Sequence, residues 1–123
     1  MKIRIKGNTI RLRLSKSEVA FFEKEKQISE ETNFGNSTLI YQLVNDVNAG
    51  SIKATLQNNC ISVHIPSEDS LKWTSSNLVG LSNDMDVGND KKLFILIEKD
   101  FKCLDETIED QSDNYDNPLA QAK

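Results

Sequence analysis

Aliphatic and polar residues alternate at the start of the chain, and this alternation predicts a β-hairpin. Every second position in residues 2–6 and 9–14 is Ile or Leu. Gly7-Asn8 between them has the composition of a two-residue hairpin turn with glycine first. Such a turn pairs Lys6 with Thr9, so the aliphatic side chains share one face of the hairpin and the charged side chains share the other.

A helix is predicted directly after this hairpin. Ser15 and Glu18 have the spacing of a capping box, in which each side chain bonds the backbone of the other residue. Val19 and Phe22 follow three positions apart, on one side of a helix over residues 16–26. We expect that side to face the core.

The same unit is written again in residues 52–73. Asn58-Asn59 is a second plausible two-residue turn, because Asn tolerates positive φ, and it pairs Leu56 with Ile61. Pro66 marks the end of the second hairpin, and Ser67 is the expected N-cap of a second helix over residues 67–75. The hairpin repeats after 51 residues.

The second helix is predicted to repeat the first with an offset of 52. This offset places Leu71 and Trp73 where the first helix has Val19 and Phe21. Trp73, together with Tyr41, Phe22, Phe94 and Phe101, is expected on the inward face of its element.

Each half is completed by two more strands. The segments STLIYQLV (37–44) and KKLFILIE (91–98) are apolar at consecutive positions, as is typical of strands covered on both sides, and they predict strands at 37–45 and 93–100. A weak strand is predicted near 28–34, and a further strand at 78–84. We therefore predict an α+β fold with a mainly antiparallel sheet, in which two pseudo-symmetric hairpin-helix-strand-strand repeats share one core. The single domain covers residues 1–102, and its halves are about 1–47 and 51–102.

Length and composition fit a soluble domain and exclude several classes of protein. The chain has 123 residues, 37% hydrophobic and 28% charged, and no apolar run approaches the roughly 20 residues that span a membrane. The first residues lack the continuous apolar segment of a secretory signal, so we expect a cytoplasmic protein. Cys60 and Cys103 are far apart and without CxxC spacing, which argues against a disulfide framework or a zinc site.

Charge is unevenly distributed along the chain. The net charge is −4, yet residues 1–50 carry eight Lys or Arg against six Asp or Glu. Residues 103–123 hold six carboxylates and one lysine and show little apolar content. We predict that 103–123 form an acidic, partly flexible C-terminal tail.

Several stretches resemble one family of short bacterial proteins. MKIRIKGNTIRLRLSKSEV, LIYQLV and LFILIEKDFKCLDE, with a following DNYDNP, are similar to a Bacteroidetes-type family known only as a domain of unknown function. The resemblance covers almost the whole chain. It implies no catalytic residue, since that family has no established activity, and Glu106-Thr107 depart from the Arg-Pro of its pattern.

A weaker likeness involves the first hairpin. IKGNTIRLRLSKSEV is similar to the swapped-hairpin DNA-binding modules of antitoxins and transition-state regulators, and residues 54–73 repeat the likeness more dimly. In those modules basic strand edges contact DNA phosphates. The resemblance implies that two copies in one chain imitate their dimer.

Five cations on the polar face of the first hairpin are the candidate site. They are Lys2, Arg4, Lys6, Arg11 and Arg13. Like charges opposite one another cost up to about 1 kcal/mol per pair, so a negative group should compensate. That group is either the protein's own carboxylates, with the acidic tail as the nearest candidate, or an external anion.

The second hairpin argues against a two-sided nucleic-acid clamp. Its matching outward residues are Lys53, Thr55, Gln57, Ser62 and His64, which are nearly uncharged. No aromatic residues interleave with the cations of the first hairpin in sequence, which disfavours single-strand stacking. Nucleic acid stays an open but disfavoured partner.

No catalytic, metal or cofactor site is predicted. His64 is the single histidine and is expected at the surface or half-buried, too far along its strand from Cys60 to pair with it. Residues 110–117 have some calcium-loop spacing but lack its glycine and final glutamate. No phosphate-binding glycine loop occurs.

We therefore expect a non-enzymatic domain that binds a macromolecular, anionic partner through the first hairpin. One alternative is a small-ligand protein or enzyme with a pocket between the halves, using Cys103 and tail carboxylates. Another is a basic face covered by the acidic tail. The sequence fixes neither the oligomeric state nor the partner.

Overall fold

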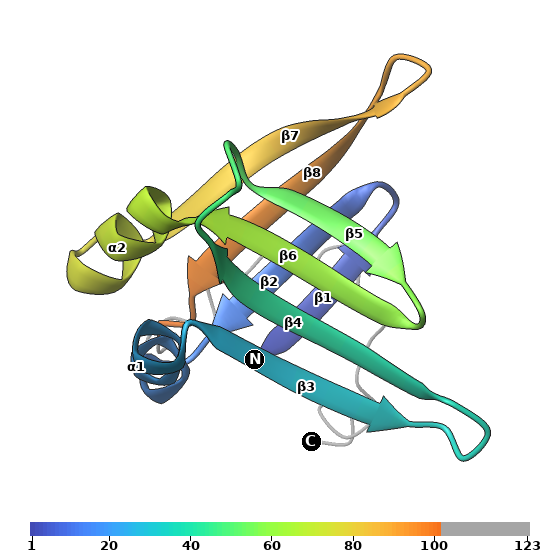
Figure 1. Ribbon diagram of the computed structural model, residues 1–123, viewed down its shortest axis with the longest axis horizontal. Helices are drawn as coiled ribbons and strands as arrows, with labels where there is room; N and C mark the ends of the chain where they lie inside the picture. The colour runs from blue at the N-terminus through green and yellow to red at the C-terminus, as the bar shows by residue number, and fades with distance from the viewer. Residues whose placement is uncertain (102–123) are drawn as a thin grey trace, which may run out of the picture.

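Eight strands and two helices form a two-sheet sandwich with both helices at one end (Figure 1). The computed structural model describes residues 1–101. Its elements in chain order are β1 (Lys2–Lys6), β2 (Thr9–Leu14), α1 (Lys16–Glu25), β3 (Gln27–Asn33), β4 (Thr38–Asp46), β5 (Lys53–Gln57), β6 (Cys60–Pro66), α2 (Ser67–Ser75), β7 (Gly80–Gly88) and β8 (Lys91–Lys99). Sheet A has the order β1-β2-β8-β7 and sheet B the order β3-β4-β6-β5. The predicted α+β class is confirmed.

Both predicted hairpins are confirmed in register. Lys6 pairs with Thr9 in the first hairpin, and Leu56 pairs with Ile61 in the second. Gly7 adopts a φ of 52°, whereas Asn58 and Asn59 both have positive φ. Both turns therefore use the left-handed conformations that glycine and asparagine tolerate and that match the twist of a hairpin.

The two halves fit an approximate twofold relation, and each sheet takes one hairpin from each half. In sheet A, β2 runs parallel to β8 with Thr9 beside Phe94; in sheet B, β6 runs parallel to β4 with Cys60 beside Ile40. Adding 51 to Thr9 gives Cys60, and subtracting 54 from Phe94 gives Ile40. Two backbone hydrogen bonds are equivalent under this relation: the Phe94 N–H donates to the Asn8 carbonyl (3.0 Å), and the Ile40 N–H donates to the Asn59 carbonyl (2.9 Å). The halves exchange strands, which goes beyond the predicted packing of one half against the other.

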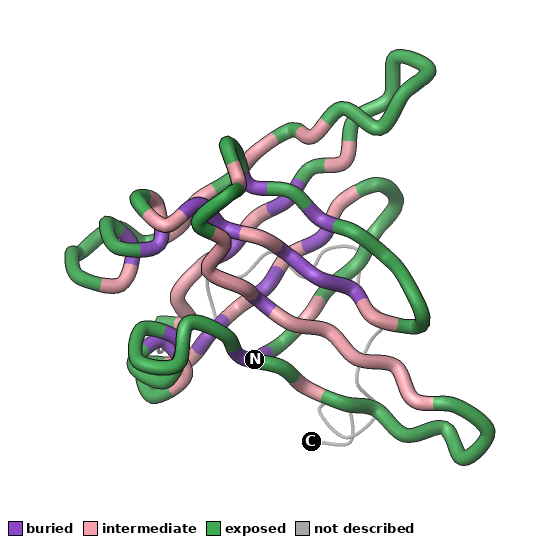
Figure 2. Tube along the Cα trace, viewed as in Figure 1, coloured by how far each residue is buried: buried purple, intermediate pink, exposed green. Residues whose placement is uncertain are grey.

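The core lies between the sheets and under the helices (Figure 2). Most inward side chains of the central strands are buried, and two aromatic residues of the helices are fully buried. Phe22 of α1 meets Trp73 of α2 edge to face, with ring centroids 6.2 Å apart. Each such aliphatic or aromatic side chain contributes about 1.5–3 kcal/mol on burial. The two halves thus share one core, as predicted.

The predicted offset of 52 for the helices is wrong. The buried residues of α1 are Val19 and Phe22, and those of α2 are Ser70 and Trp73, so the offset stays at 51. Leu71 is consequently 65% exposed. A helix in the same place must present the same turn positions to the core, and matching by residue type alone overlooked this constraint.

The ends of the helices also differ from one another. The capping box of α1 is present, with the Ser15 hydroxyl accepting from the Glu18 N–H and the Glu18 carboxylate accepting from the Ser15 N–H. The predicted Ser67 cap of α2 is wrong, because Pro66 occupies the N-cap position and Ser67 is the first helical residue. The Ser67 hydroxyl instead donates to the Asn45 side chain at 2.6 Å.

Two aromatic residues expected inside lie outside. Phe94 is 36% exposed and Phe101 is 62% exposed. In β8 the neighbouring Ile95 and its companion Ile97 face the core, so strand alternation turns Phe94 and Leu96 to the outer face. Among residues 1–101, the core therefore covers the inner side of β8, whereas its outer side is only partly covered.

The candidate tail at 103–123, with Cys103 and the calcium-like stretch 110–117, lies outside the described residues. Neither helix within residues 1–101 has both the length and the apolar character needed to cross a bilayer.

Candidate anion-binding face

Strand alternation places the five predicted cations on the outer face of sheet A. Ile10, Leu12 and Leu14 of β2 are buried, so the intervening Arg11 and Arg13 point away from the core. Arg4 pairs with Arg11, and Lys2 pairs with Arg13, as predicted. We call the surface formed by Lys2, Arg4, Lys6, Arg11 and Arg13 the cationic face.

One carboxylate that sequence reasoning missed neutralises part of this face. Glu98 of β8 lies beside Arg13 in the parallel pair with β2. It accepts from Arg13 Nε at 3.0 Å and Nη2 at 2.8 Å, and Arg11 Nε lies 3.6 Å from the same oxygen. A partly exposed pair of this kind contributes about 0.2–1 kcal/mol. Glu98 was missed because the contact depends on a strand pairing between residues 85 positions apart.

The remaining cations are less compensated. Lys2 Nζ lies 3.2 Å from Asp100, and the lysine side chain is 77% exposed. Among residues 1–101, Arg4 and Lys6 form no ion pair. Positive charge not balanced by the described residues is therefore concentrated on β1 and beside its turn.

Two shallow hollows lie between these side chains. The larger, of about 280 Å³, is lined by Lys2, Ile3, Arg4, Arg11 and Arg13. The smaller, of about 240 Å³, is lined by Arg4, Lys6, Thr9 and Arg11. Arg4 and Arg11 border both hollows. Their planar guanidinium groups suit the bidentate binding of a carboxylate or phosphate group, and both hollows are large enough to hold one.

The rest of the outer face changes character from strand to strand. Next to the cations, β8 presents Phe94 and Leu96, and β7 beyond it presents Asp84 and Asp86. The same face of β8 also carries Lys92, 4.0 Å from Asp86, and Glu98 at its other end, so the strongly positive β1 and β2 give way to a mostly apolar and then acidic surface. Phe94 is brought beside Thr9 of the first hairpin by the parallel pairing of β2 with β8.

Sheet B carries a neutral counterpart of the cationic face. Gln27 donates to Gln42, which donates to Ser62 at 2.8 Å, and Cys60 lies 3.5 Å from the Ser62 hydroxyl. These polar side chains therefore serve as hydrogen-bond partners for one another. This surface offers an internal comparison for sheet A, because the same strand positions carry almost no charge.

His64 is half-buried, as predicted, and contacts Asp46 rather than Cys60. Its Nδ1 lies 3.1 Å from the Asp46 carboxylate. The backbone N–H of Asn48, and to a smaller extent His64 and Lys53, lower the pKa of Asp46 below its ordinary value. Asp46 is the last residue of β4, so its contact with His64 links the end of β4 to β6.

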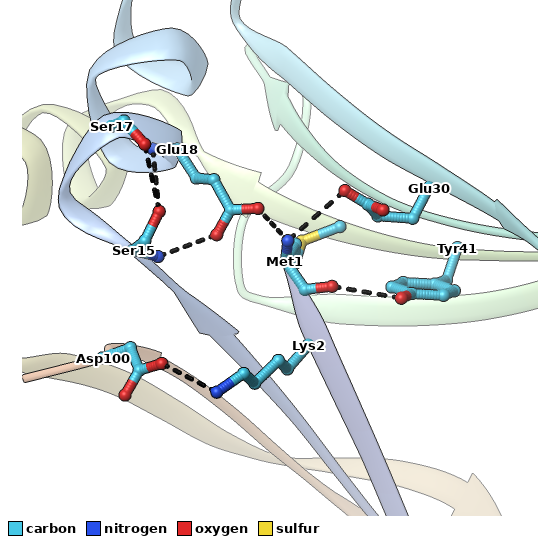
Figure 3. Close-up of polar contacts among 8 residues, drawn as sticks. All are labelled: Met1, Lys2, Ser15, Ser17, Glu18, Glu30, Tyr41 and Asp100. Carbon is cyan, nitrogen blue, oxygen red and sulfur yellow. Dashed lines mark hydrogen bonds and ion pairs between the residues drawn. The ribbon is translucent and has the colours of Figure 1, made fainter.

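A buried ammonium group forms a second polar cluster beside α1 (Figure 3). The Met1 ammonium group binds Glu18 and lies 3.3 Å from Glu30, while the Tyr41 hydroxyl donates to the Met1 carbonyl at 3.1 Å. Burial raises the pKa of Glu18, but hydrogen bonds from the ammonium group and Ser15 outweigh it and hold the pKa below its ordinary value. Burial, with the charges of Glu30 and Glu18, raises the pKa of Tyr41. All four residues are thereby partnered, and the cluster joins β1 to sheet B.

Two grooves flank the contact between the helices. One, of about 610 Å³, is lined by residues of both halves, including Leu14, Val19, Thr74 and Lys99. The other, of about 520 Å³, has Glu23, Asn45, Ser70 and Thr74 among its lining. Within residues 1–101 no group of three His, Cys, Asp or Glu is placed to hold a metal ion.

Comparison with known proteins identifies a family but no function. Residues 1–119 match the model of a family of unknown function, DUF7009. No curated protein and no solved structure matches the chain.

Proposed function

The chain belongs to DUF7009, a family of unknown function, and from the charges on its surface we propose that it is a non-enzymatic domain that binds an anionic macromolecule on the cationic face. The sparse cysteines suit the cytoplasm as its compartment. The family resemblance suggests a bacterial source.

The observation that carries this proposal is the pairing of Arg4 with Arg11. The two arginines are cross-strand partners in β1 and β2, and both residues line both hollows. Glu98 contacts Arg11 and Arg13 but not Arg4. A bound carboxylate or phosphate would relieve the repulsion between Arg4 and Arg11, which is a favourable change available only on binding.

A direct test is the binding of polyglutamate to the full chain at low ionic strength. We expect Arg4→Gln to weaken binding about tenfold, because a charge-assisted hydrogen bond is lost. Lys53→Gln is the matched control, since it removes one cation from the outer face of the equivalent edge strand β5 and should leave binding nearly unchanged. Affinity should fall as salt rises.

A gain-of-function variant sharpens the test. Glu98→Gln frees Arg11 and Arg13 from their internal partner, so it should tighten polyglutamate binding several-fold. Glu31→Gln, an exposed residue of sheet B, is its charge-matched control. If wild type fails to bind at low salt, or if all four variants bind alike, the cationic face is not a binding site.

A second candidate is a small-ligand site in the groove of about 610 Å³. Its volume is typical of ligand pockets, and both halves line it, as the sequence-based alternative required. Ala20→Trp would fill this groove from the exposed side of α1. Loss of a thermal-shift response to a ligand library in that variant, with polyglutamate binding intact, would favour this candidate.

A further inference from the structure

β1 is an edge strand that presents two different rows of side chains. In the order β1-β2-β8-β7, only β2 pairs with β1 among residues 1–101. The outer row is Lys2, Arg4 and Lys6, and the inner row is Ile3 and Ile5. An edge strand also exposes alternate backbone N–H and C=O groups, which can pair with a further strand.

Ile5 shows that the inner side of this edge is open near the turn. It is 56% exposed, whereas its cross-strand partner Ile10 is only 9% exposed. Ile3, at the other end of β1, already packs against the core. An apolar side chain placed beside Ile5 would remove both from water, which is favourable in proportion to the area covered.

The charge gradient across sheet A favours a partner that lies along β1. A polyanion that crossed the sheet would leave the cations of β1 and β2 and meet Asp84 and Asp86 on β7, with Lys92, which lies 4.0 Å from Asp86, as the one cation facing it on β8. A polyanion aligned with β1 stays beside Lys2, Arg4 and Lys6 throughout. The nucleic-acid backbone has no row of apolar groups to place beside Ile5, whereas an extended peptide can have one.

Building on the proposed function, we propose that the anionic partner is an extended peptide segment that joins sheet A as a strand beside β1. Its acidic residues occupy alternate positions, and aliphatic residues lie between them. The acidic side chains then contact the outer cations, the aliphatic ones contact Ile3 and Ile5, and backbone hydrogen bonds join the strands. The cations of β1 also repel an equally basic edge, which disfavours pairing between β1 strands of two copies.

Synthetic peptides test the alternation. The full chain is titrated with a heptapeptide of alternating Glu and Val and with a block peptide of the same composition. The alternating peptide should bind about tenfold more tightly, because only its extended form separates acidic from apolar side chains onto opposite faces.

N-methylated peptides test the backbone pairing. Successive N–H groups of a strand point to opposite sides, so two versions are made, methylated at odd or at even positions. One version should lose binding, because its methyl groups face β1, and the other should retain it.

Ile5→Ser tests the apolar contact, and Leu56→Ser is its matched control. Leu56 is the equivalent residue of β5 and is 70% exposed, so both variants should fold with little change in the urea midpoint. The Ile5→Ser variant should bind the alternating peptide about fivefold more weakly than wild type, while its affinity for polyglutamate stays unchanged. Leu56→Ser should change neither.

The outcomes separate this inference from the proposed function. Equal binding of alternating and block peptides, or of both N-methylated peptides, would overturn strand addition while polyglutamate binding still supported the anion site. Strand addition would also be overturned if duplex DNA bound more tightly than the alternating peptide and if Ile5→Ser left the affinity for DNA unchanged. Concentration-dependent self-association that Asp84→Asn abolishes would assign this edge to β7 of a second copy instead. Absence of any anion binding would remove both proposals.

Discussion

Two carboxylates show that individual charges in this protein are balanced over long distances in sequence. Glu98 binds Arg13 across the parallel pair of β2 and β8, and Glu18 binds the Met1 ammonium group beside α1. Counting charges along the first hairpin therefore overstates how cationic its surface is. The observed ion pairs show that, among residues 1–101, the cations of this surface without a carboxylate partner are Arg4 and Lys6.

Glu18→Gln is expected to destabilise the fold by about 1–2 kcal/mol at neutral pH, because it removes the negative charge that pairs with the buried Met1 ammonium group, while the amide oxygen of Gln can still accept from the Ser15 N–H. The folded-state pKa of Glu18 is lowered, so its contribution to stability is present above the unfolded-state pKa and is lost as pH falls through the folded-state pKa. The unfolding free energies of wild type and variant, measured by urea denaturation, should therefore converge in acid.

Glu23→Gln is the control for this prediction, because Glu23 is an exposed residue of the same helix. A difference between wild type and Glu18→Gln that stayed constant from pH 7 to pH 3 would show that the ionised carboxylate is not what stabilises the N-terminus.

At the scale of elements, helix register decides which aromatic residues matter. Phe22→Ala should cost about 3–5 kcal/mol, because Phe22 is fully buried against Trp73. Phe21→Ala should cost well under about 1 kcal/mol, because Phe21, unlike the adjacent Phe22, is 51% exposed. Denaturant midpoints of the two variants test the register directly. Comparable losses would mean that α1 is rotated about its axis.

Elements fixed by local chemistry could be predicted from the sequence, and elements fixed by long-range pairing could not. Gly7-Asn8 and Asn58-Asn59 set the register of the hairpins, and the Ser15 capping box set the start of α1, within a few residues of chain. The pairing of β2 with β8 joins distant segments, and no local pattern specifies it. For that reason the position of Phe94 and the role of Glu98 were missed, although the five cations were placed correctly.

At the scale of the whole molecule, charge is separated between the two ends of the chain. Residues 104–123 contain six carboxylates and one lysine, so deleting them changes the net charge from −4 to +1. We expect the deletion to tighten polyglutamate binding through the long-range field alone, with an effect that salt suppresses.

The deletion also tests whether the acidic segment covers the cationic face. A salt-resistant gain in affinity, or a lower unfolding free energy, would support such covering. Unchanged stability together with a gain that disappears in about 0.5 M salt would leave only the effect of net charge.

The exchange of hairpins between the sheets has a consequence for assembly. Each sheet draws its two inner strands from opposite halves, so a half-chain on its own cannot build a complete sheet or close the core. Two separate half-chains would have to find each other in solution, at a rate and yield set by their concentration. The short connection between Asp46 and Lys53 makes that encounter intramolecular and raises the effective concentration of each half near the other to the millimolar range, in order of magnitude.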